Sequence, residues 1–177
     1  TRKAGERWQA SEGPEVIYNP ETRYYYLFLA YDELAVAYNT RVCRARNITG
    51  PYFGMDGANV TNGADCYPVV THPYKFKPQV AADSISGWVG IAHCGVFTDG
   101  EGNWFYTSQG RLPEGARGNA YSNAIMHGHV RRILWTESGW PVVLPERYAA
   151  VPQASLTAEE FVGEWEHINL TYSYQKQ

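Results

Sequence analysis

Hydrophobic and polar positions alternate along this chain in short runs that end at turns, which is typical of β-strands. The first unit opens with a short apolar strand at 14–19, PEVIYN, and continues through a polar turn at 19–23, NPETR. An aromatic strand follows at 24–31, YYYLFLAY, and an arginine-bearing strand at 40–52 ends in Gly-Pro-Tyr. The order predicts an antiparallel sheet whose consecutive strands are joined by hairpins.

A second unit repeats this order about 80 residues later. It contains a short strand at 94–98, CGVFT, a turn at 99–103, DGEGN, and an aromatic strand at 104–111, WFYTSQGR. An alternating arginine-bearing strand at 129–143 then runs through a Gly-Trp-Pro corner. Sheets of about four strands repeated around an axis form a β-propeller, which typically has four to eight such blades. The repeat therefore predicts an all-β fold.

Two units with a less regular stretch at 53–92 between them amount to about half of a small propeller. An open half-ring leaves a bare strand edge and an uncovered core. We therefore expect residues 1–152 to be the C-terminal blades of a propeller whose N-terminal blades are absent from this chain. Residues 153–177 are expected to be a linker with one short helical turn and the first strand of an appended β-domain, truncated here.

Composition narrows the choice of partner. Aromatic residues make up 15% of the chain and the formal net charge is −3, so no basic face is available for nucleic acid. Aromatic faces suit sugars, and an uncharged or weakly charged ligand fits better. No apolar run approaches the roughly 20 residues of a membrane helix. The three cysteines, Cys43, Cys66 and Cys94, match no zinc spacing and are expected to be small buried residues, with one disulfide and one free thiol as the alternative.

The tetrapeptide Ser-Glu-Gly-Pro at 11–14 supplies the first candidate for chemistry. It stands directly before the first strand of the first unit, and a carboxylate at a strand start near a propeller axis points into the central cleft. Glu12 is therefore the candidate acid, although a glutamate before Gly-Pro is more often a solvated turn residue.

Several motifs in order resemble glycoside hydrolase family 43, particularly its endo-1,5-α-L-arabinanases. They are the strings SEGPEVIYNPETRYYYLFLAYDELAVAYNTRVCRARNITGPY, GWVGIAHCGVF, WFYTSQGR and HVRRILWTESGWPVVLPERYA, and the resemblance covers residues 8 to about 152. It implies a five-bladed β-propeller and an inverting mechanism that uses a general base, a general acid and a third carboxylate. Glu12 matches the general acid, whereas the positions of the other two lie upstream of Thr1, so the chain alone lacks the general base.

The resemblance also assigns roles to other residues. His93 matches a histidine that coordinates a calcium ion together with waters, so calcium is the expected cofactor. Arg111 matches an arginine that projects into the substrate cleft, and Gln109 is its weaker companion. Tyr31 and Asp32 lie where a strand runs out onto a face of the propeller and are further candidate substrate contacts. The plain alternatives are a hydrogen-bonded core histidine, a surface salt bridge for the arginine, and a turn-capping aspartate.

Two other patterns are discounted. His127 and His129 share one face of a strand but have no third ligand at a suitable spacing, so a structural role is expected. Trp104, Trp135 and Trp140 could stack on sugars, but their positions in strands indicate core residues.

The motifs and the resemblance together predict a secreted protein, extracellular or periplasmic, that cleaves α-1,5-linked arabinan in an endo-acting manner. Its expected partners are arabinan or arabino-oligosaccharides and the missing N-terminal half of the propeller. Two alternatives stay open at this point: an exo-acting arabinofuranosidase or xylosidase on the same fold, and a carbohydrate-binding propeller without catalysis.

Overall fold

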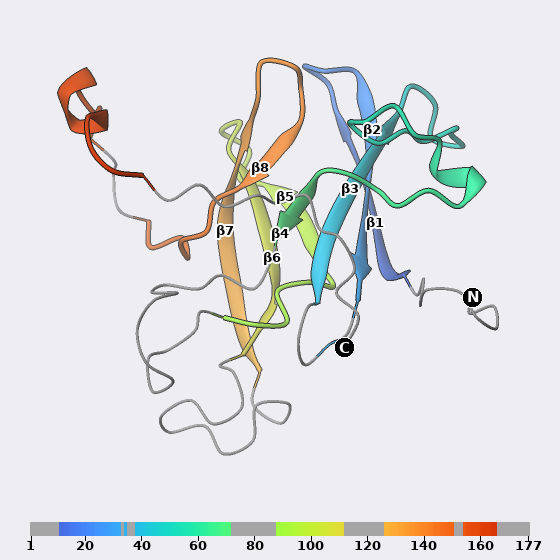
Figure 1. The fold of residues 1–177 in the computed structure, drawn as a ribbon, viewed down its shortest axis with the longest axis horizontal. Helices are drawn as coiled ribbons and strands as arrows, with labels where there is room; N and C mark the ends of the chain where they lie inside the picture. The colour runs from blue at the N-terminus through green and yellow to red at the C-terminus, as the bar shows by residue number, and fades with distance from the viewer. Residues whose placement is uncertain are drawn as a thin grey trace.

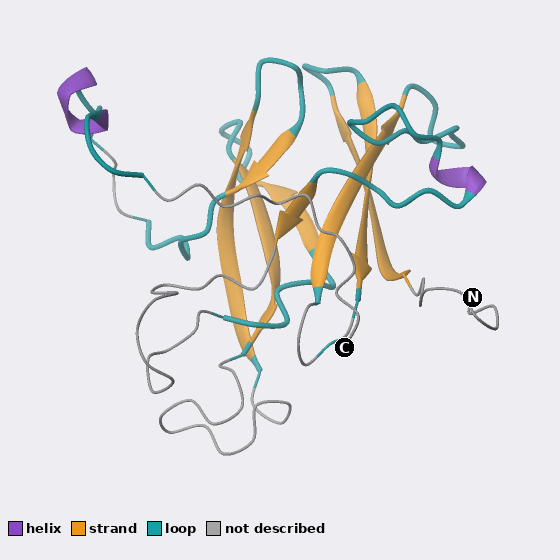
Figure 2. Cartoon of the chain, in the orientation of Figure 1, coloured by secondary structure: helices purple, strands orange, loops and turns teal. Residues whose placement is uncertain are grey.

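The computed structural model describes residues 11–32, 34, 38–71, 88–111, 126–150 and 154–165. These residues form two four-stranded antiparallel sheets that stand next to each other (Figure 1). Figure 2 shows that strands and loops make up almost all of this part of the chain, with two short 3₁₀ helices and no α-helix. The strands are β1 (Ser11–Asn19), β2 (Tyr24–Tyr31), β3 (Asn39–Ala45), β4 (Val69–Thr71), β5 (Gly95–Thr98), β6 (Trp104–Gly110), β7 (His127–Trp135) and β8 (Pro141–Val143). The all-β prediction is confirmed.

The first sheet follows the chain in the order β1-β2-β3-β4. The hairpin between β1 and β2 forms because the Asn19 side chain accepts a hydrogen bond from the Glu21 backbone amide at 2.9 Å. Arg23 then takes a left-handed conformation with φ of 56°, and its amide donates to the Asn19 carbonyl at 2.8 Å. The strands predicted at 14–19 and 24–31 are confirmed, whereas the strand predicted at 40–52 ends at Ala45 and a turn follows it. The short strand β4 was not predicted, since it lies inside the irregular stretch.

The second sheet repeats this plan in the order β5-β6-β7-β8. Asp99 organises the turn between β5 and β6, because its carboxylate accepts from the backbone amides of Glu101 at 2.8 Å and Asn103 at 3.1 Å. The hairpin between β7 and β8 closes through the Thr136 hydroxyl, which accepts from the Trp140 amide at 2.9 Å. The predicted repeat is therefore two equivalent blades.

One apolar core holds the two sheets together. Its buried members are Tyr26, Phe28, Val42, Val70, Ile91, Tyr106, Ile133, Trp140 and Val143. Hydrogen bonds accompany this packing. The Tyr26 hydroxyl donates to the Gly139 carbonyl at 2.5 Å, and the hydroxyls of Thr40 and Tyr106 lie 2.7 Å apart. Trp104 and Trp135 pack against the same core. The tryptophans are core residues, as their strand positions predicted.

The described tail contains the 3₁₀ helix η2 (Ala158–Phe161), whose residues are all exposed. This is the short helical turn that was predicted. Residues 166–177, where an appended strand was predicted, lie outside the described residues, so the second domain and its boundary at 153 stay predictions. No described helix is long and apolar enough to span a membrane.

Candidate functional site

Glu12 lies at the start of β1, which is an edge strand of the first sheet, and its side chain is exposed. A register shift between Glu12 and Glu15 interrupts the pairing with β2, and Gly13 within it has φ of 57°. A Cβ atom on Gly13 would lie 2.9 Å from Cδ2 of His93. Glycine is therefore required here, because it allows both the left-handed backbone and the close approach of the imidazole.

Tyr38 connects the two predicted residues of the site. Its hydroxyl donates to Oε1 of Glu12 at 2.5 Å and lies 3.4 Å from Nδ1 of His93. The Tyr38 side chain is buried, and burial raises its pKa, with the hydrogen bond and charge of Glu12 adding to the effect. The phenol is therefore a neutral donor at any pH at which a glycosidase works.

Sequence reasoning missed Tyr38, although strand register contains the signal. Tyr31 pairs with Ser11 on one side and with Asn39 on the other. Tyr38 directly precedes Asn39, so it arrives at the same sheet end as Glu12.

His93 has an exposed side chain and a left-handed backbone with φ of 58°. Calcium takes six to eight oxygen ligands. Within the described part of the chain no group of three or more His, Cys, Asp or Glu side chains could hold an ion. The described residues alone do not fit a calcium site, and no chemical step is assigned to an ion here.

Arg111 follows β6 and is 1% exposed. Val89 and Arg111 form an isolated bridge, and Nη2 of the guanidinium donates to the Leu34 carbonyl. Its Nε and Nη1 have no hydrogen-bond partner among the described residues, and burial lowers the Arg111 pKa. A Cβ atom on Gly90 would lie 2.5 Å from Nη2, so this glycine leaves the room that the guanidinium occupies.

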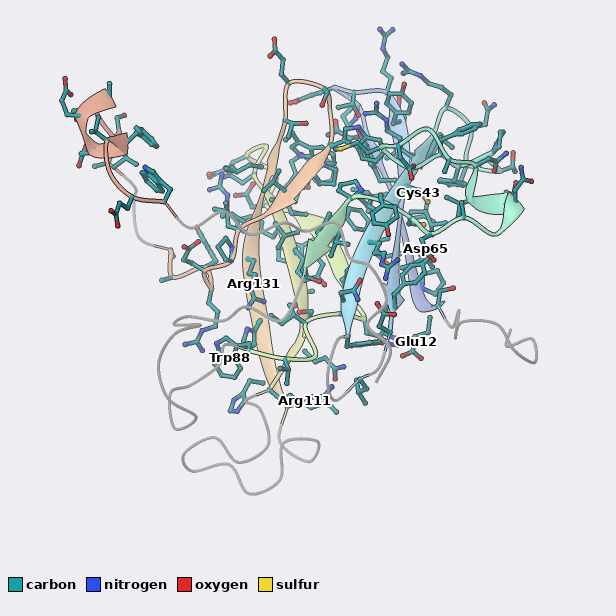
Figure 3. All side chains as sticks on the ribbon, in the orientation of Figure 1. Glu12, Cys43, Asp65, Trp88, Arg111 and Arg131 are labelled. Carbon is teal, nitrogen blue, oxygen red and sulfur yellow. The ribbon has the colours of Figure 1, made fainter. Side chains whose placement is uncertain are left out.

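Glu12 and Arg111 both lie toward the same end of the two sheets (Figure 3). Tyr38 is close enough to Arg111 for each to affect the pKa of the other. Buried N–H groups of a cation are costly to leave without bonds, and Nε and Nη1 of Arg111 are suited to sugar hydroxyls or to a carboxylate. The structure thus brings together three of the functional candidates: Glu12, His93 and Arg111.

Trp88 lies at the same end, next to Val89. Its ring packs edge-on against His129 at 4.4 Å, and the Arg147 guanidinium lies 5.2 Å from its centroid. A surface hollow of about 720 Å³ is lined here by Trp88, Gly128, Val130, Pro145, Glu146, Arg147, Tyr148 and Ala149. An aromatic ring beside charged donors is a chemistry that suits a sugar.

The remaining predicted substrate contacts lie near the same end of the sheets, but two of them are engaged in structural contacts. Gln109 is half-buried on β6, opposite Gly128. Tyr31 is buried, and its hydroxyl donates to Sγ of Cys66 at 3.5 Å. Asp32 accepts from the fully buried Arg41 at 2.8 Å. The contacts of Tyr31 and Asp32 hold the first sheet together, and a role in substrate binding stays a prediction for all three.

His129 is buried on β7, with Nδ1 3.0 Å from Nη2 of Arg131. Burial, together with the charge of Arg131, lowers the His129 pKa to about 4. A histidine that stays neutral within a strand agrees with the structural role predicted for it.

The chain is similar to known proteins of one family. Residues 1–141 match the model of the glycosyl hydrolases family 43. The chain is 32% identical over 95% of its length to an extracellular endo-α-(1→5)-L-arabinanase of Thermotoga petrophila, of which it covers 36%. It is 28% identical over 89% of its length to extracellular endo-α-(1→5)-L-arabinanase 2 of Bacillus subtilis, of which it covers 35%.

A solved endo-1,5-α-L-arabinanase structure from Thermotoga petrophila superimposes with a TM-score of 0.70 at 26% identity, over 85% of this chain and 34% of that one. Such enzymes are five-bladed β-propellers, so the two sheets are two blades of this fold, as the resemblance predicted. The chain spans about a third of the length of the curated relatives it matches. It belongs to the glycosyl hydrolases of family 43.

Proposed function

We propose that the protein to which this chain belongs is an endo-acting glycosidase that cleaves α-1,5-linked arabinan, with Glu12 as its general acid. The observation that carries the proposal is the hydrogen bond between Glu12 and the buried Tyr38, at the start of the strand where the family motif predicts the acid. Two curated relatives named endo-α-(1→5)-L-arabinanases support the choice of substrate.

The acid has two tasks in this mechanism. Glu12 gives its proton to the glycosidic oxygen as the bond to the leaving sugar breaks, and a carboxylate then remains. Tyr38 fixes the orientation of the carboxyl group and stabilises that carboxylate through its donated hydrogen bond. An inverting enzyme needs a second carboxylate about 6.5–9.5 Å away to activate water on the opposite face of the sugar. We place this base, and the third carboxylate, in the part of the propeller upstream of Thr1.

Arg111 has the role of a positioning or substrate-binding residue. Its two unpartnered donors, Nε and Nη1, can bond sugar hydroxyls or a carboxylate contributed by another blade. Either partner would remove the cost of leaving these two buried donors without bonds. Gln109, which lies on β6 two residues before Arg111, is proposed as a weaker companion in this contact.

Calcium binding at His93 is a separate proposal. The imidazole is exposed to solvent, and most ligands would be waters or groups from other blades. Calcium titration of the full-length protein by calorimetry tests it: His93→Ala should abolish one binding event, and unchanged binding would refute the assignment.

We also propose an extracellular location, because both curated relatives are named extracellular. The further partner is the N-terminal half of the propeller, and apolar side chains on the outer faces of the two sheets support this. Val16, Tyr18, Phe97, Leu134 and Val142 are 44–47% exposed there.

The decisive test is hydrolysis of linear 1,5-α-arabinan by the full-length protein, with products separated by size and xylan as comparison polymer. The proposal predicts a ladder of short oligomers and its loss in Glu12→Gln. Release of arabinose alone would indicate exo action instead. Binding without cleavage would indicate a carbohydrate-binding propeller, and preference for xylan would contradict the substrate assignment.

A further inference from the structure

Two cysteines of the first sheet lie close together in a buried position. Cys43 is on β3 and Cys66 is on the loop that leads to β4, and both side chains are fully buried. Their sulfur atoms are 3.2 Å apart. A disulfide needs an S–S distance of about 2.05 Å, so a relative movement of about 1.2 Å brings the pair to bonding distance. Cys43 is labelled in Figure 3.

The surroundings make one of these thiols the better nucleophile. The hydrogen bond with Cys43 lowers the Cys66 pKa, and the Tyr31 hydroxyl and the nearby Arg41 charge add to this. The hydrogen bond with Cys66 and burial raise the pKa of Cys43. Because the thiolate is the reactive form, Cys66 is the sulfur that attacks first, once the loop that carries it opens enough to admit an oxidant.

We propose that Cys43 and Cys66 form a disulfide when the protein reaches an oxidising compartment, and that Cys94 remains a free thiol. The inference rests on the proposed extracellular location, since disulfides persist in oxidising compartments and are rare in reducing ones. Cys94 directly precedes β5 of the other sheet, and burial raises its pKa to about 12, which makes it a poor nucleophile.

The step is a thiol–disulfide exchange with a small-molecule or protein disulfide as oxidant. The Cys66 thiolate attacks one sulfur of the oxidant, and the first leaving thiolate takes up a proton. Cys43 loses its proton and attacks the Cys66 sulfur of the mixed disulfide, and the second leaving thiolate takes up that proton. Two protein thiols are oxidised to one S–S bond, and one oxidant disulfide is reduced to two thiols.

The crosslink would secure a charged cluster next to it. Asp65, the neighbour of Cys66, lies 3.2 Å from the fully buried Arg41, which also pairs with Asp32 at 2.8 Å. The Arg41 guanidinium lies 4.4 Å from the centroid of the Tyr31 ring. A bond from Cys43 to Cys66 ties the loop that carries Asp65 to β3, and so keeps both carboxylates on the buried cation.

Tryptic peptide mapping tests the crosslink directly. Trypsin places Cys43 in the peptide 42–44, Cys66 in 47–75 and Cys94 in 76–111. The full-length protein is incubated with oxidised glutathione, denatured without reductant, alkylated with iodoacetamide and digested. The proposal predicts that 42–44 is linked to 47–75, that 76–111 is alkylated, and that reduction before alkylation releases the linked pair.

Variants control for chance pairing. Cys94→Ser should keep the linked peptide, and Cys43→Ser should remove it and leave 47–75 alkylated. Closing a loop of this length should raise Tm of the full-length wild-type protein by about 3 °C between the reduced and oxidised forms. Cys43→Ser should show no such shift.

Recovery of 42–44 and 47–75 as separate alkylated peptides from oxidised wild-type protein would overturn the proposal, whether or not the variants fold. The mapping uses no substrate, so an inactive protein with the linked peptide would refute only the proposed function. An active protein without it would refute only the crosslink.

Discussion

Replacing Tyr38 with phenylalanine removes one hydroxyl and keeps the buried ring. The hydroxyl donates to Glu12 at 2.5 Å. A hydrogen bond to a charged group contributes about 1.5–3 kcal/mol, and about 1.36 kcal/mol corresponds to a factor of ten in rate. Because Glu12 is exposed and water can replace part of this bond, the lower end applies, which is about tenfold.

The loss falls on the chemical step. The carboxylate that Glu12 becomes as it gives up its proton loses the donor that stabilises it, and the carboxyl group is less firmly oriented. In Tyr38→Phe kcat should therefore fall about tenfold, while KM should change little.

The assay measures kcat and KM of the full-length protein on linear 1,5-α-arabinan. Tyr18→Phe is the matched control, since Tyr18 lies on the same strand as Glu12 and is 45% exposed. Its kcat and KM should match the wild type. An unchanged kcat in Tyr38→Phe, or a loss confined to KM, would refute the assignment of Tyr38 as the donor that acts on the acid.

Three further predictions concern the residues around this site. Gly90→Ala should lower kcat/KM at least tenfold by displacing Arg111. The control Gly100→Ala, with φ of 83° and open space around it, should cost only about 1 kcal/mol of stability. Equal losses of activity in the two variants would contradict this. Asp32→Asn should lower the free energy of unfolding by about 3 kcal/mol in urea denaturation with KM unchanged, and the reverse result would favour a substrate contact. Because the His129 pKa is lowered to about 4, the folded state binds fewer protons than the unfolded state between pH 6.5 and 4. About 2 kcal/mol of stability should therefore be lost on acidification through that window. His129→Gln should flatten the dependence of the unfolding free energy on pH, and an unchanged dependence would contradict the assignment to His129.

The sequence predicted the fold well because strand periodicity and turn chemistry are local. Asn19 and Asp99 organise the hairpins through bonds to amides two to four residues away, and such signals are readable in the chain. The strand β4 was missed because three residues, Val69–Thr71, contain too little periodicity to stand out.

Candidate site residues were harder to predict, since their contacts depend on register and packing. Glu12 was identified by its motif, but its donor Tyr38 is 26 residues away and meets it only through two strand pairings. The end of the strand predicts Tyr31 and Asp32 as substrate contacts on a face of the propeller. Both residues instead contact the fully buried Arg41, and nothing in the strand pattern reveals that partner.

The measurement that most directly tests the central claim compares two leaving groups in Glu12→Gln. An acid is needed to protonate a poor leaving group such as a sugar alkoxide, but not a 2,4-dinitrophenolate. The account predicts that Glu12→Gln loses at least a hundredfold in kcat/KM on arabinan but retains activity within about tenfold on a 2,4-dinitrophenyl arabino-oligosaccharide. Equal losses on both substrates would contradict the assignment of Glu12 as the general acid.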